Sequence, residues 1–89
     1  RPELWNESSA ESIEKNGKKL IKLVWDARDK TTVNLTGYTK LIQYVDPSMK
    51  VIVNTDFFGP NKKLIRKQVT YKIKNIKGQN IPVEFKTTD

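Results

Sequence analysis

The chain has 89 residues, 36% of them hydrophobic and 30% charged, a composition that suits one folded domain better than a disordered segment. It has a formal net charge of +7 and contains no cysteine and no histidine. Disulfide frameworks, thiol nucleophiles and histidine-based catalytic or metal sites are therefore excluded, and no apolar run approaches the roughly 18 residues needed to cross a bilayer.

The amino terminus differs from the rest of the chain in charge. Residues 1–17 hold four acidic and two basic side chains, whereas residues 18–89 hold fifteen basic and six acidic ones. We expect residues 1–7 to form a flexible segment and residues 8–89 a single α+β domain. Because the chain starts at Arg1 and not at Met, we expect an excised domain of a larger protein or a mature form. The two sequons, at Asn6 and Asn34, favour a secreted or surface-exposed protein.

The pattern of residues 8–29 predicts a helix. Ser8 and Glu11 fit a capping box, and acidic residues precede lysines, as the helix dipole prefers. The apolar residues that share one helical stripe are Ile13, Leu20, Ile21 and Val24. However, Asn16-Gly17 is also the strongest two-residue hairpin signal. Residues 11–26 could therefore form a hairpin, or a short helix could end at Gly17, and the sequence leaves these structures open beside the favoured helix.

From Thr31 onward the hydrophobic pattern changes to a period of two, which predicts strands. The expected strands are "TTVNLT", which continues across a bulge at Gly37 into "YTKLIQYV", then "MKVIVNTDFF", "KLIRKQVTYKIK" and the alternating Ile81, Val83 and Phe85. Turns are predicted at Asp46-Pro47-Ser48, at Gly59-Pro60-Asn61 and at "IKGQN". Pro82 indicates that the last strand lies at a sheet edge, because proline lacks a backbone donor.

This order of elements predicts an α+β fold, with an N-terminal helix packed on a four- to five-stranded, mostly antiparallel sheet. An all-β sandwich or a small barrel is the fallback if residues 11–26 form a hairpin.

Two adjacent phenylalanines stand out because neighbouring side chains of a strand point to opposite faces. If Phe57 continues the face of Met49, Val51 and Val53, Phe58 shares the face of Ile52. We therefore expect Phe57 to lie in the core and Phe58 to be exposed or to cap the core. On this interpretation Phe57→Ala lowers stability by about 3 kcal/mol or more, while Phe58→Ala leaves it nearly unchanged.

A basic run follows the two phenylalanines. It contains Lys62, Lys63, Arg66, Lys67, Lys72, Lys74 and Lys77 within sixteen residues and no acid. Such a field attracts acidic partners, although lysines on a strand also prevent edge-to-edge aggregation. The candidate binding residues are Phe58, Lys62, Lys63, Arg66, Lys72 and Lys74.

No motif in the sequence supports catalysis, a cofactor or a metal site, so we predict that the chain is not an enzyme. The favoured function is a non-catalytic protein-interaction module that binds an acidic or apolar protein surface. The alternative is a nucleic-acid-binding domain that uses the basic sheet face, and the third possibility is a small inhibitor or scaffold domain. Phosphate binding would weaken steeply with salt, whereas binding through buried aromatic side chains would not.

Overall fold

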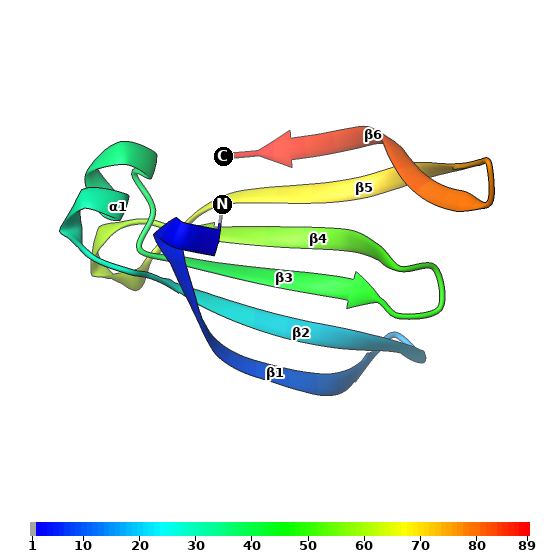
Figure 1. Cartoon of the computed structure of the whole chain (residues 1–89), viewed down its shortest axis with the longest axis horizontal. Coiled ribbons are helices and arrows are strands. Elements are labelled where there is room, and N and C mark those ends of the chain that lie inside the picture. Colours follow the sequence, from blue (N-terminus) through cyan, green and yellow to red (C-terminus); the bar gives the residue numbers. More distant parts are fainter. Residues whose placement is uncertain (1) are drawn as a thin grey trace.

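Six antiparallel strands form one sheet in the computed structural model, which describes residues 2–89 (Figure 1). The strands are β1 (Trp5–Lys15), β2 (Lys18–Ala27), β3 (Lys40–Asp46), β4 (Val51–Phe58), β5 (Leu64–Ile76) and β6 (Gln79–Thr88). One helix, α1 (Lys30–Thr36), and two 3-10 turns, η1 (Pro2–Leu4) and η2 (Pro60–Lys62), complete the described fold. Each strand pairs with the strand that precedes it in the chain, so the sheet is a simple meander.

The predicted helix over residues 8–29 is wrong, because this stretch forms the β1–β2 hairpin. Asn16 and Gly17 connect the two strands with φ values of 54° and 76°, the left-handed backbone that a two-residue hairpin turn requires. Apolar residues that were assigned to one helical stripe are neighbours across the two strands, as Ile13 and Leu20 are. The acidic residues that precede the lysines in sequence face them across the two strands, as Glu11 faces Lys22.

The opposite error concerns residues 31–36. We expected them to form a strand, but they belong to the helix α1. Asp29 caps this short helix, because its carboxylate accepts a hydrogen bond of 2.9 Å from the backbone nitrogen of Thr32. Gly37 ends it with a φ of 79°, and its nitrogen donates to the carbonyl of Val33 at 2.7 Å. Two local caps therefore override the β propensity of threonine and valine.

The other predicted strands and turns are confirmed. The strand after Gly37 is β3, the turn at residues 47–50 leads into β4, and β5 and β6 meet at Lys77 and Gly78. Pro82 lies in β6, which is an edge strand of the sheet. Extended alternation thus identified these four strands correctly.

The α+β fold class is contradicted, because the described residues form almost entirely antiparallel sheet and the all-β fallback is closer. The helix α1 lies at the end of the sheet and does not cover a face (Figure 1). Among the described residues only Leu20 and Val51 are buried hydrophobic side chains. Both faces of the sheet are consequently half open to solvent, whereas a sheet usually buries one face against another layer.

The expected division into a flexible segment (residues 1–7) and a domain (residues 8–89) stays a prediction, and β1 begins within that segment, at Trp5. No helix in the described part of the chain has the length and apolar character needed to span a membrane.

Candidate functional site

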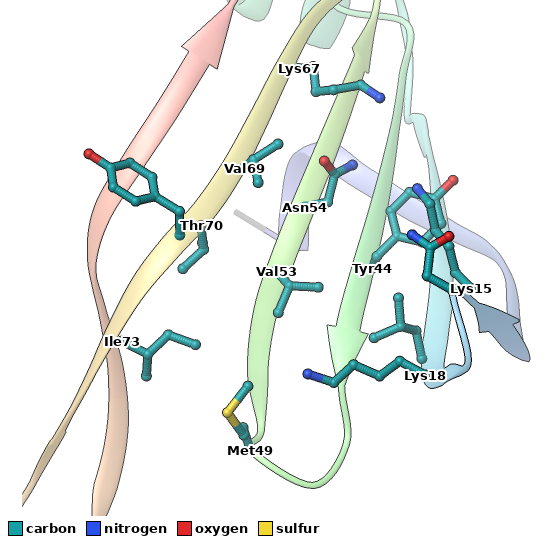
Figure 2. Close-up of a pocket in the computed structure, with 13 residues that line it drawn as sticks. Lys15, Lys18, Tyr44, Met49, Val53, Asn54, Lys67, Val69, Thr70 and Ile73 are labelled. Atoms are coloured by element: carbon teal, nitrogen blue, oxygen red, sulfur yellow. The ribbon is translucent and has the colours of Figure 1, made fainter.

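A groove of about 610 Å³ lies on one face of the sheet, between the β1–β2 turn and β5 (Figure 2). Its apolar floor comes from β2, β4 and β5 and includes Leu20, Val53 and Val69. Three basic side chains, Lys15, Lys18 and Lys67, line the same space. We call this site the lysine-rimmed groove.

A β-bulge in β4 shapes the floor. Tyr44 pairs with Asn54, but the next residue, Val45, pairs with Ile52, so Val53 is left without a partner across the strands. Both Val53 and Asn54 therefore line the groove, although an unbroken strand would send adjacent side chains to opposite faces.

Two of the three lysines are held by buried carboxylates. Lys18 Nζ lies 2.9 Å from Oδ2 of Asp46, and Lys67 Nζ lies 3.8 Å from Oδ1 of Asp56. Asp46 is 1% exposed and Asp56 is 9% exposed. These acids offset two of the positive charges, so the groove is less basic than its lysine count suggests.

Lys15 differs from the other two lysines. Its Nζ lies 5.1 Å from the centre of the Tyr44 ring and forms no ion pair with a carboxylate of the described residues. Burial raises the pKa of Tyr44, and the negative charge of Asp56 raises it further, so the phenol keeps its proton at neutral pH. The groove thus offers one ammonium group and one neutral hydroxyl above an apolar floor.

The bulge also reverses the predicted faces of the two phenylalanines. Phe57 pairs with Leu41 on the face of Ile52, and Phe58 lies on the face of Val51. Both rings are half-buried, so Phe57 is not the fully buried core residue that we expected. The centre of the Phe57 ring is 4.9 Å from that of Tyr38, so this ring packs in a small aromatic cluster at the α1 end of the sheet.

The structure does not bring the six sequence-derived candidates together. Phe58, Lys62 and Lys63 lie at the end of the sheet near α1. Lys74 is eight residues along β5 from Arg66, which corresponds to about 26 Å in an extended strand.

Two of the predicted basic residues are also engaged in ion pairs. Arg66 makes a two-pronged contact with Asp89 and stacks over Tyr38, and Lys72 Nζ lies 3.8 Å from Oε2 of Glu84. Among the described residues no cluster of three or more carboxylates could hold a metal ion.

Sequence reasoning missed the groove because a helix over residues 8–29 does not contain the turn that places Lys15 beside Lys18. The signal that could have found them is Asn16-Gly17, since a two-residue turn places its flanking residues side by side.

Comparison with known proteins identifies the fold. The sequence matches no protein-family model and no curated protein. The structure is similar to that of a DUF1329 family protein from Desulfovibrio piger, with a TM-score of 0.81 and 13% sequence identity, over 96% of this chain and 34% of that protein. It is also similar to a putative outer membrane lipoprotein-sorting protein domain from Vibrio parahaemolyticus, with a TM-score of 0.64 and 20% identity, over 84% of this chain and 29% of the other.

The chain therefore spans about a third of the length of each neighbour. Because both sequence identities are low, the structural similarity shows only that the chain shares the antiparallel sheet of these proteins.

Proposed function

We propose that this chain is a non-catalytic binding module whose lysine-rimmed groove takes an apolar ligand with a negative charge. The observation that carries this proposal is the juxtaposition of Lys15 with an apolar floor. An anionic head group would meet the ammonium group of Lys15, while an aliphatic chain would lie on Val53 and Val69.

The neighbours support a binding role over a catalytic one. Neither is described as an enzyme, and one is described as a putative lipoprotein-sorting domain. A lipid-modified protein presents an acyl chain next to a polypeptide. This ligand class combines the protein partner that we predicted with the apolar floor of the groove.

A location outside the cytoplasm remains part of the proposal. The two sequon asparagines, Asn6 and Asn34, are exposed, on β1 and α1 respectively.

Nucleic-acid binding, the alternative, has less support from the geometry. The basic residues are spread along β5 and the loop before it, and Arg66 and Lys72 are already paired with carboxylates. Two of the aromatic side chains that could stack on bases are already engaged, because Tyr38 packs on Phe57 and Tyr44 lies under Lys15. The inhibitor or scaffold role stays a prediction.

A titration with a fluorescent long-chain fatty acid and with its methyl ester tests the proposal. The two probes share the aliphatic chain and differ in the negative charge. We expect Lys15→Gln to weaken binding of the acid about fivefold, as expected for one exposed ion pair of about 1 kcal/mol. The same variant should leave binding of the ester unchanged, and Val53→Ser should weaken binding of both probes.

Lys30→Gln is the matched control, because Lys30 is an exposed lysine on α1, at the other end of the sheet. Equal losses for Lys15→Gln and Lys30→Gln would mean that net charge, and not the groove, drives binding. Failure of the wild-type protein to bind either probe would reject the groove as an acyl site.

A further inference from the structure

The β5–β6 hairpin exposes an unusual combination of side chains. Residues 64–88 contain six basic residues and one acidic residue, a net charge of +5. They also contain eight of the ten large hydrophobic side chains that are exposed in the described chain. These are Leu64, Ile65, Val69, Tyr71, Ile76, Ile81, Val83 and Phe85. A soluble surface normally scatters such side chains singly, and a contiguous cluster marks an interaction site.

The outer half of this hairpin projects from the sheet. β5 pairs with β4 only from Leu64 to Val69, whereas it pairs with β6 as far as Ile76. The turn at Lys77 and Gly78 projects beyond the β3–β4 turn (Figure 1). On one side of this two-stranded ribbon Asn80 donates a hydrogen bond of 3.2 Å to the carbonyl of Met49 in the β3–β4 turn, whereas Lys74, Ile76 and Ile81 are exposed and accessible to a partner.

Aromatic and basic side chains meet on the ribbon. Val69, Tyr71, Phe85 and Lys86 together line a shallow hollow of about 370 Å³. Tyr71 is 65% exposed and Phe85 is 50% exposed. Nearer the turn, Lys74 and Lys77 form no ion pair with a described carboxylate and flank Ile76, which is 46% exposed.

We infer that the β5–β6 hairpin docks on an anionic lipid surface, with Ile76, Tyr71 and Phe85 at the level of the head groups and the lysines against their negative charges. Charge complementarity selects this occupant. A second copy would bring two hairpins of net charge +5 together, which costs electrostatic energy. Apolar and aromatic residues interleaved with lysines fit the boundary between water and acyl chains, where both kinds of side chain are stabilised.

The test is co-sedimentation with vesicles of phosphatidylcholine alone and with vesicles that also contain phosphatidylglycerol. We expect binding to the mixed vesicles only, with an affinity that falls as salt is added. Lys74→Gln and Lys77→Gln should each lower partitioning about fivefold. Ile76→Ser with Phe85→Ser should lower it further. Circular dichroism verifies that these exposed substitutions leave the sheet folded.

The matched controls lie on α1, at the opposite end of the sheet. Leu35→Ser removes a side chain that is 70% exposed, and Lys30→Gln removes one positive charge. Both should leave vesicle binding unchanged. Equal binding to neutral vesicles, equal losses in the α1 controls, or stronger binding to polyglutamate or to a duplex oligonucleotide would overturn the inference. So would a concentration-dependent dimer that Phe85→Ser abolishes.

The hairpin surface and the groove share Val69 and Tyr71, but the inference does not require the proposed groove ligand. Lys74, Lys77, Ile76 and Phe85 do not line the groove, so their variants should bind the soluble fatty acid like the wild-type protein. Lys15→Gln, in turn, should weaken fatty-acid binding while the hairpin variants do not. Failure of one proposal therefore leaves the result for the other interpretable.

Discussion

Lys18 Nζ lies 2.9 Å from Oδ2 of Asp46, and this contact ties the β1–β2 turn to the β3–β4 turn. The other oxygen of Asp46 accepts hydrogen bonds from the backbone nitrogen and hydroxyl of Ser48, at 2.9 and 2.7 Å, and from the nitrogen of Met49 at 3.2 Å. One carboxylate that is 1% exposed thus organises a turn and also holds a lysine at the rim of the groove.

Removal of this carboxylate should destabilise the protein more than removal of the lysine. Asp46→Ala leaves the donors of Ser48 and Met49 without their partner, whereas Lys18→Gln removes an exposed lysine and leaves the carboxylate its three hydrogen bonds within the turn. We expect the urea midpoint to fall clearly for Asp46→Ala and slightly for Lys18→Gln. Equal midpoints for both variants would contradict the role of Asp46 in the turn.

The same carboxylate should make stability depend on acid pH. The Ser48 hydroxyl and then Lys18 lower the pKa of Asp46 well below its ordinary value. Because the folded pKa is lower than the unfolded value of about 3.9, the stabilisation is fully present above about pH 4 and is lost as pH falls below it. Urea unfolding measured at several pH values should show this loss, and the loss should be smaller in Asp46→Asn.

Gly17 offers a test that separates the hairpin from the helix. Its φ of 76° disfavours a side chain, and no atom lies within 4 Å of an added Cβ, so backbone conformation alone decides the outcome. Gly17→Ala should therefore destabilise the protein by about 1 kcal/mol. In a helix the same substitution would stabilise by about 1 kcal/mol, so the sign of the change in urea-unfolding free energy is decisive.

Asn16→Gly is the control for this substitution. Asn16 has a φ of 54°, which glycine also adopts without strain. Its effect should be close to zero. A large loss would mean that the asparagine side chain, and not the turn backbone, stabilises the hairpin.

The extended part of the chain was predictable because strands are identified by alternation, and β3 to β6 alternate over enough residues. Local sequence patterns predicted the wrong element where the same pattern fits both a helix and a strand. Acidic residues before Asn16 and lysines after it suit both the dipole of a helix and a cross-strand ladder, in which Glu11 pairs with Lys22 and Glu14 with Lys19. In α1 the caps at Asp29 and Gly37 were the decisive signal, and the threonines around them favoured the wrong element.

The candidate site was less predictable than the fold because it depends on register. The bulge at Val53 cannot be read from "KVIVNTDFF", yet it decides which residues line the groove and which faces the two phenylalanines occupy. Lys15 and Tyr44 are 29 positions apart in the chain and meet only through the pairing of three strands.

The corrected faces change the expectation for the two phenylalanines. Both rings are half-buried, on opposite faces of β4. Phe57→Ala and Phe58→Ala should each lower the free energy of unfolding by about 1–2 kcal/mol, less than the 3–5 kcal/mol of a fully buried ring. Urea denaturation measures both, and Leu35→Ala, at a side chain that is 70% exposed, should have almost no effect. A loss confined to Phe57→Ala would restore the original face assignment.

The short helix α1 should depend on its caps more than on its own sequence. Its seven residues include three threonines and a valine, which favour strands, and isolated helices of this length are unstable in water. Asp29→Ala removes the acceptor for Thr32, whose side chain is 1% exposed, and should cost about 1 kcal/mol in urea-unfolding free energy. Asp29→Ser keeps a capping oxygen and should recover most of that stability. If both variants lose the same amount, the negative charge of Asp29, and not its hydrogen bond, holds the helix.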